Sequence, residues 1–156
     1  MRKIILVALI LMCLGGSTAA TASAEIRLAT QGVEEPLQVE PPVVAYTGDG
    51  TGYLGGRSTS PGDLNQGGLN WLSWGGSSAL ARGYAWLNDC RPYCAAGTFH
   101  RHRAIIRVRR PRHALYTRMT IKFRYRGQWA YDHRILEYTG GYYVWGICGS
   151  RYTKPC

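Results

Sequence analysis

Residues 99–126 decide the fold, and they read FHRHRAIIRVRRPRHALYTRMTIKFRYR. Apolar and basic side chains alternate in this stretch with a period of two, the pattern of a half-buried β-strand. Arg110-Pro111-Arg112-His113 interrupts it, because proline disfavours a strand interior and favours a turn. The stretch therefore predicts two antiparallel strands at residues 99–109 and 114–126.

Successive side chains of a strand point to opposite faces. If Arg109 lies opposite Ala114, Val108 meets Leu115, and apolar side chains of the two strands share one face. A slip of one residue would turn arginines into the core, so the alternation determines which residues share a face. Arg110 and Arg112 lie at the tip. The opposite, cationic face is predicted to contain Arg101, Arg103, Arg107, Arg109, Arg118, Lys122, Arg124 and Arg126.

No acidic residue occurs between Gly97 and Gln128 to balance these charges. Like charges on neighbouring strands repel, so the face costs stability unless something negative binds it. Guanidinium groups about 6.6–6.8 Å apart along a strand suit a polyanion. We expect a partner such as a wall-linked phosphate polymer, an acidic polysaccharide, a nucleic acid or an anionic lipid surface. The alternative is a solvated face that opposes edge aggregation, or one that an acidic segment neutralises.

The period of two continues on both sides, at residues 69–74, 79–88, 129–138 and 142–148. Gly83 marks a candidate bulge, and Gly140-Gly141 is a strong signal for a two-residue hairpin turn. In this last hairpin, alternation places Leu136 and Trp145 on one face of the strands, and Tyr131, Ile135 and Tyr142 on the other. One set is core, and exposed tyrosines of the other could stack on sugars or bases. The predicted fold class is all-β, a small antiparallel β-sandwich or barrel.

The 156-residue chain carries a net charge of +10 and opens with the features of a secretory signal peptide. Met1-Arg2-Lys3 is cationic, residues 4–14 are apolar, and Ala22-Ser23-Ala24 offers a cleavage site. The apolar run is shorter than the roughly 20 residues that span a bilayer. We expect a signal peptide at residues 1–24 and a secreted, extracellular protein that can associate with the cell surface.

Residues 25–66 contain two basic and six acidic residues, a net charge of −4, with four prolines and seven glycines. This composition predicts a flexible acidic leader. Its G-x-G-x-x-G motif at residues 50–55 lacks a following helix, so it is interpreted as a flexible glycine stretch and no cofactor is predicted. Residues 67–156 carry 15 basic and three acidic residues, and are predicted to form the basic, disulfide-bonded β domain.

Four cysteines remain after signal removal: Cys90, Cys94, Cys148 and Cys156. An even number in an exported chain predicts two disulfides, with three pairings open. The spacing would also suit zinc, but an oxidising compartment favours disulfides, so no metal site is predicted.

Catalytic patterns are sparse, and the sequence favours a non-enzymatic protein. One alternative is a small secreted nuclease, in which His100 and His102 share a strand face and act with Glu137 while arginines hold phosphate. A second alternative is a secreted inhibitor or antibacterial toxin, in which the loop between Cys90 and Cys94 contacts a protein target.

Trp71-x2-Trp74-Gly75, Gly83, and Asn88-x-Cys90-x-Pro92-x-Cys94-Ala95-x-Gly97-Thr98-Phe99 follow one another in this sequence. Over residues 70–108 the pattern resembles a group of small, uncharacterised exported proteins of GC-rich Gram-positive bacteria. The resemblance implies a signal peptide and a small β domain with a disulfide, and it implies no activity. The arginine-rich strand at residues 99–109 departs from the polar, Thr- and Val-rich strand of that group.

Overall fold

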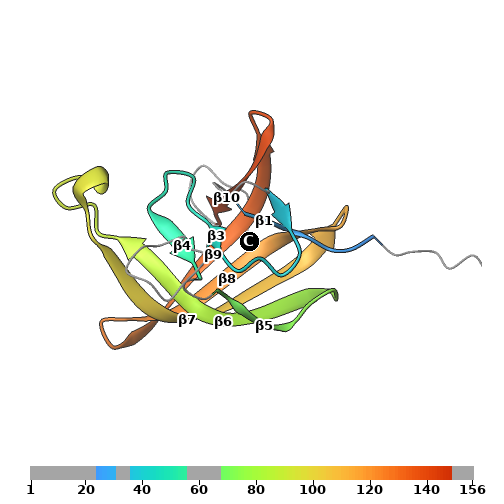
Figure 1. The fold of residues 1–156 in the computed structure, drawn as a ribbon, viewed down its shortest axis with the longest axis horizontal. Helices are drawn as coiled ribbons and strands as arrows, with labels where there is room; N and C mark the ends of the chain where they lie inside the picture. Colours follow the sequence, from blue (N-terminus) through green and yellow to red (C-terminus); the bar gives the residue numbers. More distant parts are fainter. Residues whose placement is uncertain (1–23, 31–35, 56–67, 149–156) are drawn as a thin grey trace, which may run out of the picture.

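The computed structural model describes residues 24–30, 36–55 and 68–148. These residues form an antiparallel, almost wholly β structure (Figure 1), with one short 3₁₀ turn, η2 (Cys94–Ala96). The predicted all-β, disulfide-stabilised class is confirmed. The predicted signal peptide lies outside the described residues except for Ala24.

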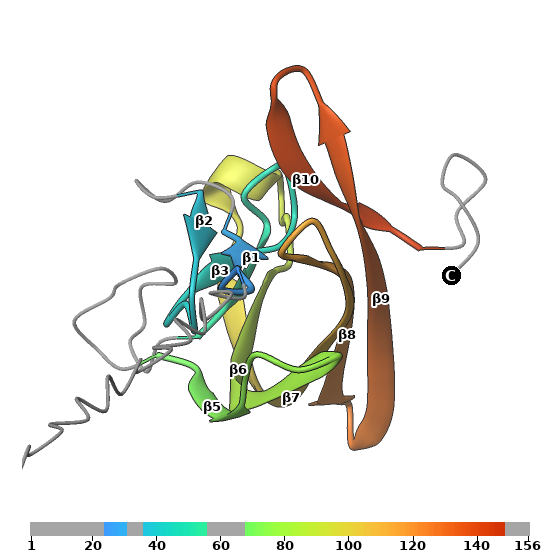
Figure 2. The same ribbon diagram turned by 90° about the vertical axis from the view of Figure 1, so that its right-hand side faces the viewer.

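One antiparallel sheet carries most of the chain. Its long strands follow one another as β6 (Ser78–Asn88), β7 (Phe99–Arg112), β8 (Leu115–Tyr125), β9 (Gln128–Thr139) and β10 (Tyr142–Ile147). Each pairs with the next, and together they curl, as Figure 2 shows. The predicted turn at Gly140-Gly141 is present, with positive φ at both glycines.

Short strands from the N-terminal half complete the sheet along the other edge of β6. β4 (Gly52–Leu54) and β5 (Asn70–Ser73) pair with different parts of that edge, and β3 (Val44–Ala45) pairs with β4. A separate two-stranded sheet consists of β1 (Leu28–Ala29) and β2 (Leu37–Gln38).

The prediction of a flexible leader over residues 25–66 is wrong for residues 25–30 and 36–55. Leu28, Val44, Tyr46 and Leu54 are 0 % exposed and belong to the same core cluster as the long strands. The physical reason is that the apolar side of a curled sheet needs a covering layer, which these segments supply. The folded domain therefore begins well before residue 67. The glycine stretch at residues 50–55 is likewise ordered, because it contains β4.

The apolar side of β7 and β8, here called the inner face, matches the predicted alternation. Its members are at most 8 % exposed: Ala104, Ile106, Val108, Met119, Ile121 and Phe123.

The predicted pairing of β7 with β8 is wrong by four residues. Val108 lies opposite Met119, not Leu115. The strand does not stop at Arg109: Pro111 pairs with Tyr116, and the connection shrinks to His113 and Ala114, both with positive φ. Such a two-residue turn with positive φ at both positions matches strand twist. Because the error is an even number of residues, every side chain keeps its predicted face.

Gly83 does not form the expected bulge, since β6 pairs with β7 without interruption through it. A Cβ at this position would lie 2.7 Å from Leu69 Cδ2, so glycine provides room for the Leu69 side chain. The irregularity lies instead between β5 and β6, at Trp71 and Ser73.

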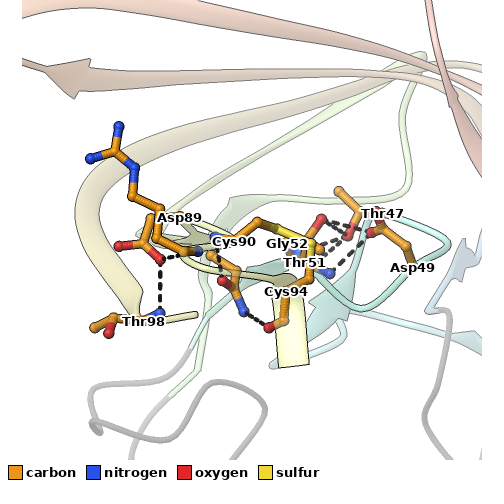
Figure 3. The surroundings of a disulfide bond; sticks show 10 residues. Thr47, Asp49, Thr51, Gly52, Asp89, Cys90, Cys94 and Thr98 are labelled. Atoms are coloured by element: carbon orange, nitrogen blue, oxygen red, sulfur yellow. Dashed lines mark hydrogen bonds between the residues drawn. A yellow bond between two sulfur atoms is a disulfide. The ribbon is translucent and has the colours of Figure 1, made fainter. Parts of the chain in front are cut away.

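A disulfide joins Cys90 to Cys94 in the β6–β7 loop (Figure 3). Asn88 holds this loop: its Nδ2 donates to the Cys94 carbonyl at 2.9 Å, and its Oδ1 accepts from the Cys90 amide at 2.8 Å. The turn between β3 and β4 lies beside it, and the Asn88 amide donates to the Thr51 carbonyl. Cys148 is also disulfide-bonded, and Cys156 lies outside the described residues.

Candidate functional site

Seven of the eight predicted cations lie along the side of β7 and β8 opposite the inner face, and we call these seven the cationic face. They alternate with buried residues along the two strands, with Arg118 and Lys122 half-buried and the others exposed. The prediction is wrong for Arg126, which follows β8 in a turn, because its guanidinium carbon lies 5.3 Å from the ring centre of Tyr125, which shares the strand parity of the inner face. The seven in the strands are Arg101, Arg103, Arg107, Arg109, Arg118, Lys122 and Arg124.

Two cations of this face oppose each other directly, because Arg109 pairs with Arg118 across the strands. Burial lowers the pKa of the Arg118 guanidinium, and the nearby charges of Arg110, Arg112 and Arg109 lower it further. The predicted repulsion between neighbouring strands is thus concentrated at this end of the hairpin.

Aromatic rings of β6 support the opposite end of the face. The guanidinium carbon of Arg101 lies 4.8 Å from the Tyr84 ring centre and 5.8 Å from that of Trp86. Trp86 in turn donates from Nε1 to the Gly55 carbonyl at 2.8 Å. This hydrogen bond fixes the Trp86 ring on the β4 side of the sheet, and the Arg101 guanidinium lies over that ring.

A second aromatic cluster comes from β9. Lys122 Nζ lies 4.4 Å from the Trp129 ring centre and 5.5 Å from that of Tyr131, and Arg124 lies 4.7 Å from the Trp129 ring. Both rings are about half exposed, at 48 % and 55 %. Sequence alternation separates Tyr131 from Leu136 and Trp145 without deciding which set is the core, and the observed register places Tyr131 beside Lys122. The face is therefore a mixed cationic and aromatic surface over β6 to β9.

Two ion pairs form between described residues, and neither uses a residue of the cationic face. His100 pairs with Asp89, and Arg134 pairs with Asp132. The ordered leader segments belong to the core, as Leu28 and Val44 show. An acidic leader that neutralises the face remains an expectation, because none of the leader residues that the structure describes forms an ion pair with the cationic face.

The second of these pairs was not foreseen. Arg134 is 9 % exposed and donates from Nε and a terminal nitrogen to both Asp132 oxygens at 2.7 Å. It also lies 5.1 Å from the ring centre of Tyr46, whose hydroxyl pKa is raised by burial and then by Asp132. The available signal was the i, i+2 spacing, which puts both charges on one strand face.

The histidines share a face as predicted and line one hollow of about 390 Å³ with Phe123. His100 Nε2 lies 3.0 Å from an Asp89 oxygen. This bond, with those donated by the Thr98 and Arg91 amides, lowers the Asp89 pKa from 3.8 to about 2. The ring of His102 lies beside Phe123.

Glu137 does not join the histidines. In the observed registers it lies toward the opposite end of the strands from His102, about 30 Å away at 3.3 Å per residue. The structure therefore does not assemble the trio of the nuclease alternative. Among the described residues, no three His, Cys, Asp or Glu side chains are close enough to hold a metal ion.

The disulfide loop of the inhibitor alternative is exposed, and Tyr93 at its centre is a large uncovered side chain. In the part of the chain that the structure describes, no helix is long and apolar enough to span a membrane. Comparison with protein-family models, with curated proteins and with solved structures finds no match. The resemblance to small exported proteins stays a prediction.

Proposed function

We propose that this chain is an exported, non-enzymatic protein that binds an anionic polymer through its cationic face. One observation carries the proposal: the cations of β7 and β8 and the half-exposed aromatic rings of β9 lie beside one another on the same side of the sheet. Export is supported by the signal-peptide pattern, and the disulfide fits an oxidising compartment.

The dimensions favour a polymer over a small ion. Arg101 and Arg109 are eight residues apart on one strand, about 26 Å at 3.3 Å per residue. A chain with repeated negative charges can contact several guanidiniums at once, whereas a single small anion neutralises one or two. The exposed surfaces of Trp129 and Tyr131 add stacking area for sugar rings or bases along the same path.

The proposal is tested by binding to polyphosphate, to a sulfated polysaccharide and to single-stranded DNA at increasing salt. Displaced counterions make such binding salt-dependent, and contact with about five cations weakens it about 100-fold between roughly 50 and 200 mM salt. Arg103→Glu combined with Arg107→Glu should abolish retention.

The matched control is Arg27→Glu with Arg91→Glu, which changes the net charge equally at two exposed positions off the face. If both double variants, still folded by circular dichroism, lose retention equally, net charge alone explains binding and the face has no special role.

The same samples distinguish the alternatives. A nuclease would degrade RNA or DNA and lose that turnover on His102→Ala. A protein antagonist would hold its target through high salt.

A further inference from the structure

A hollow of about 400 Å³ lies where the end of the β7–β8 hairpin approaches the β9–β10 hairpin. Three arginines line it: Arg110 and Arg112 from the end of β7, and Arg118 from β8. Two of them were expected at the hairpin tip, but the longer β7 brings them beside Arg118.

Arg118 is the central residue of the hollow. Its Nε is buried and has no hydrogen-bond partner among the described residues, although a guanidinium normally uses its donors fully when buried. Nearby positive charge from Arg110 and Arg112 already disfavours its charged form. An oxygen-rich anion in the hollow would supply the missing acceptor and relieve the repulsion together.

The charge of the hollow indicates which anion fits. Glu137 also lines it, so three guanidiniums and one carboxylate leave a formal charge of +2. The carboxylate lies toward β10, where a Cβ added to Gly146 would be 3.2 Å from Glu137 Oε2. Between described residues, Glu137 forms no ion pair with an arginine. A compact dianion balances the hollow, whereas a carboxylate or a phosphodiester supplies a single charge.

We propose that this hollow binds the terminal phosphate of a phosphate monoester. Arg118 is the bidentate ligand, and Arg110 and Arg112 contribute the remaining positive charge. Tyr138 and Tyr143, whose ring centres are 5.0 Å apart, form an adjoining wall against which the alcohol part of the ester can pack. This proposal extends the proposed function, because Arg118 belongs to the cationic face, and it adds a site selective for a chain end or a small monoester.

The experiment measures binding of methyl phosphate and dimethyl phosphate at pH 8 by calorimetry, with the full disulfide-bonded protein. At this pH a monoester carries close to two negative charges. Methyl phosphate should bind at least about tenfold more tightly than the diester, because the diester loses one charge-assisted contact.

Arg110→Gln with Arg112→Gln should weaken methyl phosphate binding by about tenfold or more. Arg118→Lys, which keeps the charge but removes the fork, should weaken it similarly. Arg103→Gln with Arg107→Gln is the matched control on the same face outside the hollow, and methyl phosphate binding should survive it.

A single-stranded oligonucleotide with and without a 5′-phosphate separates the two sources of a monoester. Tighter binding of the phosphorylated form identifies a polymer end; binding of methyl phosphate without that gain identifies a small molecule. The site is overturned if the protein binds no methyl phosphate and gains nothing from a 5′-phosphate. It is also overturned if methyl phosphate and dimethyl phosphate bind with equal affinity, or if the two double Gln variants lose methyl phosphate binding equally. Loss of polymer binding alone, with methyl phosphate binding intact, overturns only the proposed function.

Discussion

The two faces of the β7–β8 hairpin are made from neighbouring residues and obey different rules. Ile106 is 0 % exposed in the core, and Ile105, one residue earlier, is 36 % exposed among the cations. The inner face is optimised for burial, since its side chains meet others from β6 and the leader. The outer face places Arg109 opposite Arg118, an arrangement that costs stability. The proposed binding of an anionic polymer to the outer face would explain this contrast.

The largest expected effect comes from comparing an inner with an outer arginine. Arg134→Met removes a buried guanidinium and leaves the largely buried Asp132 carboxylate without its partner, which should destabilise the protein by about 3–5 kcal/mol. Arg103→Met, on the exposed face, should change stability by no more than about 0.5 kcal/mol. Urea denaturation measures both. Adding Asp132→Leu to Arg134→Met should restore much of the loss, and equal effects of the two single arginine variants would contradict the division into faces.

The adjacent isoleucines give the next largest contrast. Ile106→Ala should cost about 2–5 kcal/mol, because it opens a cavity among residues that are fully packed. Ile105→Ala should stay within about 0.5 kcal/mol. The same denaturation experiment compares them, and a reversed order would mean that the faces have been assigned the wrong way round.

One substitution on the outer face should stabilise the protein. Arg109→Glu removes one of two opposed like charges and places a carboxylate across from Arg118, so stability should rise by about 0.2–1 kcal/mol at low salt. Binding to polyphosphate should weaken in the same variant. Thermal unfolding at low and high salt checks the first part, because the gain should shrink as salt screens it.

The smallest effect concerns the exposed Asp89–His100 pair, beside the disulfide loop. The hydrogen bonds that lower the Asp89 pKa to about 2 favour its ionised form, so their stabilisation is present above the unfolded pKa of 3.8. It is lost as pH falls through the window from about 4 to 2. Asp89→Asn should flatten the acid limb of the stability curve there. An unchanged curve would show that the pair has no role in acid sensitivity.

Alternation predicted the long strands and the two faces of β7 and β8, because it depends only on local periodicity. It did not predict the β7–β8 pairing, since Pro111 indicates a loop locally but is tolerated at the strand end beside a two-residue turn. The prediction of a flexible leader is wrong for a related reason. The leader's proline and glycine content indicates flexibility, while its few apolar residues are buried only by contacts with the long strands in the folded core.

The parts of the candidate site that could not be predicted all depend on the register between neighbouring strands. Lys122 meets Trp129 through the β8–β9 register, and Arg118 approaches Arg110 and Arg112 through the corrected β7–β8 register. The Asp132–Arg134 pair is the exception, because its i, i+2 spacing was visible and only its burial depended on the fold.

Polymer binding by the cationic face is best tested by nuclear magnetic resonance of the arginine Nε–Hε groups during titration with polyphosphate. We expect the signals of Arg101, Arg103, Arg107 and Arg109 to shift together, while those of Arg27 and Arg91 stay in place. Shifts of equal size at all exposed arginines, or the absence of a shift at the arginines of the cationic face, would contradict polymer binding by this face.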